Sequence, residues 1–329
     1  MAGARDDILL KIVSNFPSGI SLAFAYGSGI FKQKGNVSSK NMLDFVFVLE
    51  NARQWHEENL KKQPTHYSFV GCLGSNAVVS LQDKYGAGMY YNALVPMEER
   101  IVKYGTISRH NFLLDLKDWQ WMYLSGRLHK PVKVLQEVKD QEISLALKEN
   151  LNSAVNAALL SLPEEFTEQQ LFMSIAGLSF SGDFRMIIGE NRNKVHNIVG
   201  SNIEHFRRLY KPILLSSREI QYNSFSGKCQ QNHDSSVIFS RLMSLPKNLQ
   251  QKLLGNFVPS GIESSHKETL EKLSKDKVKC SKLVQRGIRS IVQRSSMTQS
   301  VKGVITVGGY KTLLYSAQKM TKMLKGMFA

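Results

Sequence analysis

The stretch FAYGSGIFKQKGNVSSKNMLDFVFVLE, residues 24–50, decides the fold of the first part of this chain. An apolar run ends in a turn of glycine and serine, a polar loop follows, and a second apolar run carries one aspartate near its start. Both runs have the composition of β-strands, which we predict over residues 20–28 and 42–50. The second strand alternates between two faces, with Leu43, Phe45, Phe47 and Leu49 on one and Asp44, Val46 and Val48 on the other.

The turn between these strands has the composition of an anion-binding loop. Gly27 and Gly29 lack a Cβ, so the backbone N–H groups around Ser28 can approach a phosphate closely. If the turn opens a helix through residues 29–33, the helix N-terminus adds partial positive charge at the same place. Asp44 could then hold Mg²⁺ against the phosphates. The alternative is an ordinary turn and a strand-flanking aspartate, because neither a Walker lysine nor a G-x-G-x-x-G motif accompanies it.

Composition narrows the partners of this 329-residue chain. Lys and Arg outnumber Asp and Glu by 43 to 27, and the formal charge of +16 favours polyanions such as nucleic acid, nucleotides or acidic lipid. Cys72, Cys229 and Cys280 are widely spaced, which indicates neither a disulfide framework nor a zinc site and fits a reducing compartment. No apolar run reaches the length of a membrane span, so we expect any membrane contact to be peripheral.

Helices and strands alternate in the first half. We predict helices over residues 7–15, 51–63 and 113–128 and further strands over residues 99–108 and 130–135. This alternation indicates a mixed α/β domain over roughly residues 1–135. From Ser144 the pattern becomes helical, over residues 144–162 and again over residues 167–180 with Thr167 as the cap. The polar tract at residues 216–236 interrupts it as a loop or a small β-structure.

The C-terminal residues 308–329 have the pattern of a basic amphipathic helix. Its apolar positions recur at spacings of three and four, and lysines surround them: Leu313, Ala317, Met320, Leu324 and Met327, with Lys311, Lys319, Lys322 and Lys325. Such a helix can lie on anionic lipid, or it can pack on the second domain. Residues 277–303 continue the basic bias with apolar Leu283, Ile288, Ile291 and Val292, and could extend the membrane face or bind nucleic acid.

Several motifs carry a resemblance to a known family. AYGSG, a polar loop and LDFVF resemble the nucleotidyltransferase superfamily related to DNA polymerase β. FAYGSGIFKQKG and NMLDFVFVLE, with YGAGMYYN, GRLHKPVKVL, IAGLSFSGDFRM and SLPKNLQ, resemble the mitochondrial CDP-diacylglycerol synthase family. The resemblance runs from about residue 8 to the C-terminus.

This resemblance implies an activity and an architecture. The activity is that of a phosphatidate cytidylyltransferase, which converts CTP and phosphatidic acid to CDP-diacylglycerol and pyrophosphate with Mg²⁺, on the matrix side of the mitochondrial inner membrane, for cardiolipin synthesis. The implied fold is α+β, with a polymerase-β-like nucleotidyltransferase domain at residues 1–140. A mainly helical, winged-helix-like domain follows at residues 141–300, and residues 301–329 form a basic amphipathic segment that associates peripherally with the membrane.

The resemblance also assigns site residues. Gly27 and Ser28 are expected to cradle the triphosphate and Asp44 to bind Mg²⁺. The superfamily usually has two acids on this strand, but Val46 occupies the second position. Another carboxylate is therefore expected to complete the catalytic site, with Asp183 as the first candidate. Asp115 and Asp118 are the next candidates after Asp183.

Four cations are candidates for phosphate contacts: Lys103, Arg127, Lys130 and Lys133, of which Lys130 is preferred for nucleotide binding. The glycines and tyrosines of residues 85–92 could line a nucleotide pocket or form a packed turn. No histidine is included in the catalytic set. Two other functions stay open: an RNA-directed nucleotidyltransferase and a non-catalytic peripheral membrane adaptor. We do not expect nucleic acid to be the partner.

Overall fold

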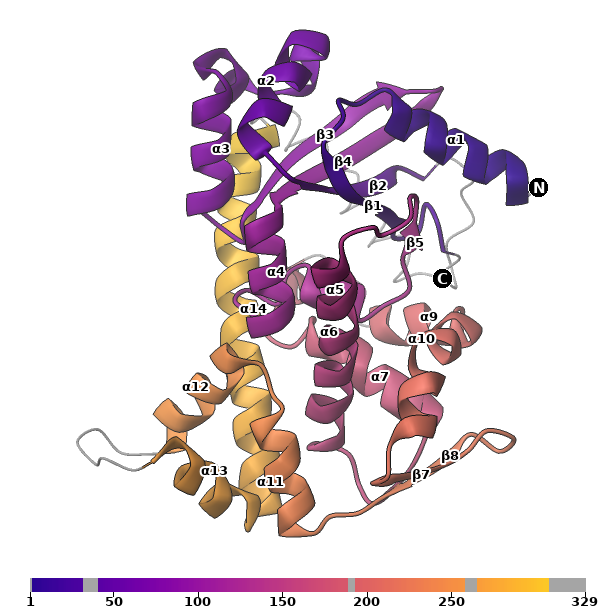
Figure 1. The fold of residues 1–329 in the computed structure, drawn as a ribbon, viewed down its shortest axis with the longest axis vertical. Helices are drawn as coiled ribbons and strands as arrows, with labels where there is room; N and C mark the ends of the chain where they lie inside the picture. The colour runs from indigo at the N-terminus through magenta and orange to yellow at the C-terminus, as the bar shows by residue number, and fades with distance from the viewer. Residues whose placement is uncertain (1, 32–40, 189–192, 258–264, 308–329) are drawn as a thin grey trace.

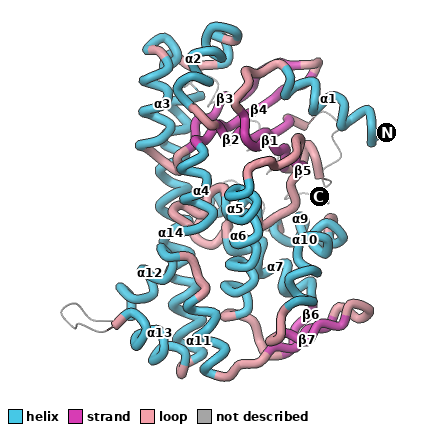
Figure 2. Tube along the Cα trace, in the orientation of Figure 1, coloured by secondary structure: helices cyan, strands magenta, loops and turns pink. Residues whose placement is uncertain are grey.

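The computed structural model describes residues 2–31, 41–188, 193–257 and 265–307. It places a five-stranded sheet with its covering helices at one end of the molecule and a mainly helical part at the other (Figure 1). Helix α14 (Lys277–Val307) runs beside both parts. Figure 2 shows the strands gathered in two separate places, the larger sheet near the N-terminus and a small sheet in the helical part. The α+β class predicted from the sequence is confirmed.

The larger sheet has the strand order β3-β4-β2-β1-β5, in which β2 and β4 are parallel and the other neighbours antiparallel. The strands are β1 (Ile20–Tyr26), β2 (Leu43–Leu49), β3 (Met89–Met97), β4 (Arg100–Ser108) and β5 (Lys133–Val134). The strands predicted at residues 20–28, 42–50 and 99–108 are confirmed, and the one predicted at residues 130–135 is reduced to the two residues of β5. The sequence does not predict strand β3, because its first five residues are all buried and show no alternation. The positive φ of Leu94 (+54°) lies where the pairing of β3 with β4 shifts its register.

Helices and 3-10 turns cover this sheet. They are α1 (Ala2–Ser14), α2 (Ala52–Lys62), η1 (Pro64–His66), η2 (Phe69–Leu73), α3 (Ser75–Lys84), α4 (Arg109–Asp118) and α5 (Ser125–Leu128). One face of β2 buries Phe45 and Phe47 against Leu9 of α1 and Trp55 of α2. The other face, which buries Val46 and packs on α4, α5 and the first turns of α6, is the face to which Asp44 belongs. The two-face pattern predicted for β2 is therefore confirmed.

The segment after β1 is a turn as far as Phe31. The backbone N–H groups of Ile30 and Phe31 both donate to the carbonyl oxygen of Gly27, at 3.0 and 2.9 Å. The second of these bonds spans four residues, as at the start of an α-helix, and the later residues of the helix suggested for residues 29–33 lie outside the described ranges.

The single helix predicted over residues 113–128 is also wrong. Helix α4 ends at Trp119, which has a left-handed φ of +52°. The Asp115 carboxylate then accepts hydrogen bonds from the backbone N–H groups of Trp121 (2.9 Å), Leu124 (2.8 Å) and Ser125 (3.0 Å). This buried carboxylate stabilises an open turn, so the chain leaves α4 and starts α5 in a new direction.

The helical part contains most of the remaining chain. Its elements are α6 (Gln141–Leu159), β6 (Glu165–Thr167), α7 (Glu168–Leu178), α8 (Arg185–Ile188), α9 (Lys194–Gly200), α10 (Ile203–Ser216), β7 (Ile220–Asn223), β8 (Lys228–Gln231), α11 (Ser235–Met243), α12 (Lys247–Phe257), α13 (His266–Ser274) and α14. Thr167 caps α7 as predicted, in a capping box with Gln170. Strands β7 and β8 pair with β6 in the order β6-β8-β7, so the β-structure suggested for residues 216–236 is confirmed.

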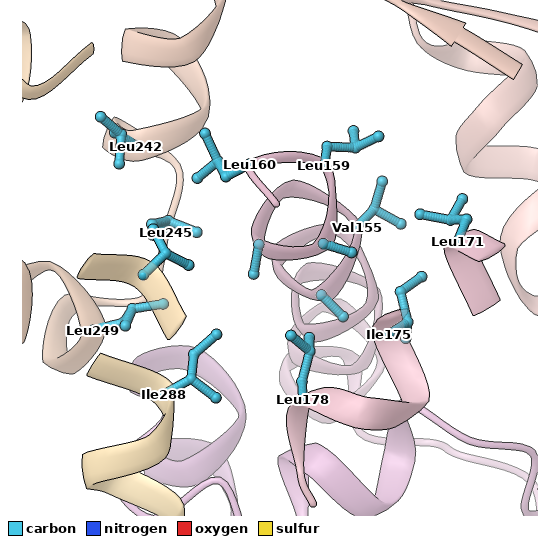
Figure 3. Close-up of a cluster of buried hydrophobic side chains, with 14 of the residues drawn as sticks. Val155, Leu159, Leu160, Leu171, Ile175, Leu178, Leu242, Leu245, Leu249 and Ile288 are labelled. Atoms are coloured by element: carbon cyan, nitrogen blue, oxygen red, sulfur yellow. The ribbon is translucent and has the colours of Figure 1, made fainter. Parts of the chain in front are cut away.

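The core of the helical part forms around α6 (Figure 3). Helix α6 lies between α7 on one side and the helices α11, α12 and α14 on the other. Its apolar residues meet both sides, and the buried side chains labelled in Figure 3 are Val155, Leu159, Leu160, Leu171, Ile175, Leu178, Leu242, Leu245, Leu249 and Ile288. The helices predicted at residues 144–162 and 167–180 are confirmed as α6 and α7.

Helix α14 belongs to both parts of the molecule. Its four predicted apolar positions between residues 283 and 292 are buried in the helical core, so the suggestion that they extend a membrane face is wrong. Its later turns reach the first part, where the Gln299 Oε1 accepts from the N–H of Ala87 (2.9 Å) and Lys302 Nζ donates to the carbonyl oxygens of Gln82 and Tyr85. The boundary predicted at residue 300 falls inside this helix.

Within the described ranges, no helix is both long enough and apolar enough to cross a membrane. The residues predicted to bind the membrane, Leu313, Lys319, Met320, Lys322, Leu324 and Lys325, lie outside the described residues.

Candidate functional site

Three side chains stand side by side across three strands of the larger sheet. Tyr26 on β1 pairs with Asp44 on β2, and Asp44 pairs with Lys103 on β4. Paired residues on neighbouring strands project to the same face, so these three side chains form a row that faces the helical part. We call them the Asp44 row. The guanidinium of Arg127, from α5, lies 4.2 Å from the centre of the Tyr26 ring and covers one end of the row.

The turn after β1 packs directly on this row. Gly27 has a φ of +80°, and a Cβ at this position would lie 3.1 Å from Asp44 Oδ2. Gly29 is more closely confined, because a Cβ there would lie 2.5 Å from the carbonyl oxygen of Met42. Gly29 is therefore required by space, and Gly27 is favoured by its backbone conformation. The turn that includes Ser28 is held against the start of β2, as the sequence predicted.

Two tyrosines line the side of the site. Lys103 Nζ lies 4.6 Å from the centre of the Tyr91 ring, and Tyr91 contacts Tyr123 with ring centres 6.4 Å apart. Burial raises the pKa of Tyr123, but the positive charges of Arg185, Lys103 and Arg127 outweigh it and lower that pKa below its usual value. Burial raises the pKa of the neighbouring Tyr91. Three cations, Arg185, Lys103 and Arg127, therefore lie close enough to act on Tyr123, and such a cluster of cations favours an anionic ligand.

Lys130 lies deeper, where the two parts of the molecule meet. Its side chain is buried, and Nζ donates to the carbonyl oxygen of Gly126 and to Ser179 Oγ (2.6 Å) on the helical part. Burial, together with the positive charges of Arg127 and Lys194, holds the pKa of Lys130 well below its usual value. The cations around the site therefore exceed their local counter-charges, and a bound phosphate would relieve that imbalance.

Asp183 is buried beside this cluster and is directed to Arg185. Its Oδ1 accepts from Arg185 Nε at 2.9 Å, and its Oδ2 accepts from Arg185 Nη2 at 2.6 Å. Its charge also acts on Lys130. The carboxylate predicted as a second catalytic acid thus orients a cation next to Tyr123, at 6.0 Å from that ring.

The donor set around Asp44 fits a single Mg²⁺ held together with substrate phosphates. Among the described residues, no group of three or more His, Cys, Asp or Glu side chains converges. Mg²⁺ commonly takes one or two carboxylates and completes its shell with phosphate oxygens and water. Because Gly27 has no Cβ, no side chain at this position separates the backbone of the turn from Asp44 Oδ2, and a triphosphate bound by the turn would lie next to this carboxylate.

Other candidates from the sequence have structural roles. Asp115 accepts three backbone N–H groups, and Lys133 forms an ion pair with Asp6 (2.8 Å), so the structure does not bring either of them to the site. The excluded histidines include His56 and His129, which are buried; burial lowers their pKa to about 4 and about 3, so both are neutral at pH 7.

Sequence reasoning missed Tyr123 and Lys194. Tyr123 lies within the turn that Asp115 holds through hydrogen bonds, and Lys194 begins α9 in the helical part, with Nζ 5.4 Å from the centre of the Phe180 ring. Neither residue belongs to a local pattern that marks it as functional. Tyr26 could have been found, because a residue that ends a strand one position before the Gly-Ser turn must lie near Asp44.

Comparison with known proteins shows which family the chain resembles. A family model described as mitochondrial phosphatidate cytidylyltransferase matches residues 9–322. Proteins of that name from Xenopus laevis and Danio rerio are each 44% identical to this chain and cover 96% of it, with 94% of their own lengths matched. The Bos taurus protein of the same name is 45% identical, with 96% of this chain and 94% of its own length matched.

Proposed function

Because this chain belongs to the mitochondrial phosphatidate cytidylyltransferase family, we propose that the site around the Asp44 row joins CTP to phosphatidic acid, giving CDP-diacylglycerol and pyrophosphate. The chain is an enzyme of the nucleotidyltransferase class. The observation that carries the assignment to this site is one carboxylate, Asp44, held against a glycine turn, with Lys103 beside it on β4 and Arg127 close enough for their charges to interact. The charge of Arg127 also acts on Lys130. This arrangement suits a polyanionic nucleotide better than a neutral substrate.

The proposed reaction needs no protein nucleophile. A phosphate oxygen of phosphatidic acid attacks the α-phosphorus of CTP and forms a new P–O bond. The bond from that phosphorus to the oxygen bridging the β-phosphate breaks, and pyrophosphate leaves with the electron pair. A phosphate monoester is largely ionised at neutral pH, with a second pKa of about 6, so positioning and charge stabilisation matter more than a general base.

Each group of residues at the site has a separate proposed role in this reaction. In this proposal the backbone N–H groups at Gly27 and Ser28 bind the triphosphate, and Lys103, Arg127 and Lys130 stabilise charge on the transferred and leaving groups. Asp44 would hold Mg²⁺, which when bound neutralises phosphate charge and orients the oxygens. For Asp183 we propose a positioning role, in which it fixes Arg185 beside Tyr123.

Finer features of the architecture are proposals of the same kind. We propose a polymerase-β-like nucleotidyltransferase domain over residues 1–140, supported by the order strand, glycine turn, acid-bearing strand. We propose a winged-helix-like domain over residues 141–300, supported by the small sheet of β6, β7 and β8 among helices. Residues 301–329 are proposed to include the contact with anionic lipid on the matrix side of the inner membrane, where the product would supply cardiolipin synthesis.

The function is tested by following labelled CTP into lipid. Purified protein is incubated with CTP, Mg²⁺ and phosphatidate-containing liposomes, beside Asp44→Asn and the control Asp7→Asn, whose aspartate is exposed on α1. A truncation before Tyr310 tests the membrane segment, and RNA replaces liposomes in a parallel reaction. We expect wild type and Asp7→Asn to make CDP-diacylglycerol and Asp44→Asn to lose about 100-fold or more of the rate, as for removal of a charge-stabilising group.

Two results would contradict this assignment. Full activity in Asp44→Asn would remove the Asp44 row as the catalytic site. Transfer of label into RNA with none into lipid, from folded wild-type protein, would favour an RNA-directed nucleotidyltransferase.

A further inference from the structure

A pocket lies in the helical part, away from the larger sheet. It has a volume of about 200 Å³ and lies between α6, α10, the start of β7 and α11. Its wall combines apolar side chains with amides and hydroxyls: Val155, Leu159, Ile213 and Ile220, with Asn152, Asn156, Ser216 and Ser217. Two charged residues, Glu219 and Arg241, complete the lining. None of these residues belongs to the site around the Asp44 row.

Arg241 is the feature that indicates a ligand. Its side chain is 2% exposed, yet neither Nε nor Nη2 has a hydrogen-bond partner among the residues that the structure describes. The nearest carboxylate oxygen, Glu219 Oε2, lies 3.7 Å from Nε, which is too far for a hydrogen bond. Buried guanidinium groups are normally fully paired, because they lose their hydration. The free edge formed by Nε and Nη2 is the edge that binds carboxylates and phosphates through two oxygens.

The guanidinium is also held in place. Its Nη1 donates to Gln231 Oε1 at 2.6 Å. The amide nitrogen of Gln231 in turn donates to three carbonyl oxygens, those of Leu159, Leu162 and Pro163. These bonds fix the orientation of Gln231 and therefore of Arg241, so the free edge is positioned before any ligand arrives.

The charge around Arg241 favours an anion of low charge. Lys277 and the neutral ring of His233 lie on its other side, and Glu219 is the acidic residue of the pocket lining. Glu219 is 40% exposed at its side chain, so it can turn toward solvent or accept a hydrogen bond from a ligand hydroxyl. The apolar wall suits a short carbon skeleton.

Two helices join this pocket to the site around the Asp44 row. On α6, five residues before Val155, Asn150 Oδ1 accepts from Trp119 Nε1 (2.8 Å) and lies 3.0 Å from His129 Nε2. On α10, three residues before Ile213, the Tyr210 hydroxyl donates to the carbonyl oxygen of His129 (2.8 Å). Both helices therefore contact the segment that carries Lys130, so a shift between them would change the position of that lysine.

We propose that this pocket is an effector site for a small hydroxylated oxyanion, a phosphate monoester or a carboxylate, which pairs two oxygens with Nε and Nη2 of Arg241. Binding at this site does not depend on the proposed cytidylyltransferase activity. Its predicted effect on the reaction does rest on that function.

Binding is tested by calorimetric titration of the full chain with inorganic phosphate, glycerol 3-phosphate and glycerate, which separates phosphate from carboxylate recognition. Arg241→Met removes the guanidinium. Ser216→Trp fills the pocket with a large side chain and keeps the arginine at residue 241. Leu215→Trp is the control, because Leu215 is 60% exposed on the same helix and does not line the pocket. A titration of Lys103→Met excludes binding at the Asp44 row.

We expect saturable binding of at least one probe by wild type, Leu215→Trp and Lys103→Met, and at least tenfold weaker binding by Arg241→Met and Ser216→Trp. If Arg241→Met fails to fold, as judged by circular dichroism, Ser216→Trp decides. Saturation by none of the probes, which would mean that the pocket holds solvent only, overturns the proposal, and so does unchanged binding by Ser216→Trp.

The effector role is tested by the rate of CDP-diacylglycerol synthesis over the same probe concentrations. We expect the wild-type rate to change at least twofold and that of Ser216→Trp to stay constant. An unchanged wild-type rate at saturation overturns the effector role. Inactive protein that still binds the probe would instead count against the proposed function.

Discussion

A Cβ atom on residue 27 would lie 3.1 Å from Asp44 Oδ2, so Gly27 and Asp44 occupy adjoining space at the end of β1. The glycine has no side chain between its backbone and the carboxylate, and a phosphate bound by the turn would meet Asp44 directly. We therefore expect phosphate binding at the site to depend on the absence of a side chain at residue 27.

Gly27→Ala is therefore expected to reduce activity about tenfold or more. The substitution also forces an alanine into a left-handed φ, which costs about 1–2 kcal/mol of stability. Gly19→Ala separates the two effects, because Gly19 has a similar φ of +84° and no atom within 4 Å of the added Cβ. We expect both variants to lose comparable stability in urea unfolding and Gly27→Ala alone to lose activity. Equal activity in the two would contradict a close approach of phosphate to Gly27.

Lys103 and Lys133 both lie on strands of the larger sheet but differ in their surroundings. Lys103 belongs to the Asp44 row, whereas Lys133 forms an exposed ion pair with Asp6. We expect Lys103→Met to lower kcat/KM for CTP about 100-fold, since it removes a cation from the phosphate site. Lys133→Met should change kcat/KM less than twofold and stability by about 0–1 kcal/mol. Steady-state kinetics at a fixed phosphatidate concentration measure kcat/KM for CTP in both variants. A similar loss of kcat/KM in the two would contradict a role of the Asp44 row in binding CTP.

Asp115 is expected to act on stability. In Asp115→Asn an amide NH₂ replaces one of the oxygens that accept N–H groups from residues 121–125, so at least one buried donor loses its acceptor. The expected loss is about 2–3 kcal/mol in the free energy of unfolding. Asp118→Asn on the same helix should change it by about 0.5 kcal/mol or less. Urea unfolding measures both, and equal stabilities would show that the turn does not depend on the Asp115 carboxylate.

The buried side chain of Lys302 is expected to make the free energy of unfolding depend on pH. Burial lowers its pKa from 10.5 to about 7, with Asp83 opposing, so the unfolded chain binds a proton more strongly than the folded one between these values. Folding releases that proton, and the Lys302 contribution becomes more stabilising as pH rises from 7 toward 10, by at most about 1.4 kcal/mol per pH unit.

Urea unfolding at pH 7, 8 and 9 tests this sign. The stability difference between wild type and Lys302→Met should grow in favour of wild type with increasing pH. Lys84→Met, which changes an exposed lysine at the end of α3, should follow wild type at every pH. A difference that stays constant from pH 7 to 9 would mean that Lys302 is charged in the folded protein over this range.

Local pattern was sufficient for the regular elements. The alternation of β1 and β2, the spacing in α6 and α7 and the cap at Thr167 all depend on neighbours in sequence, and the structure confirms them. The errors occur where a distant or buried group overrides the local preference. Asp115 breaks the expected helix at residues 113–128 through its backbone contacts, and burial of the first five residues of β3 removes the alternation that would mark it as a strand.

For the site, the sequence by itself determined the Gly-Ser turn and Asp44, because both belong to one strand–turn–strand unit of short range. Only the tertiary structure decided that Lys103, Arg127 and Lys130 join them. Lys103 arrives through the parallel pairing of β2 with β4, and Lys130 through burial between the two parts of the molecule. Parallel pairing and the burial of a charge depend on contacts between residues far apart in the chain, which no local periodicity records.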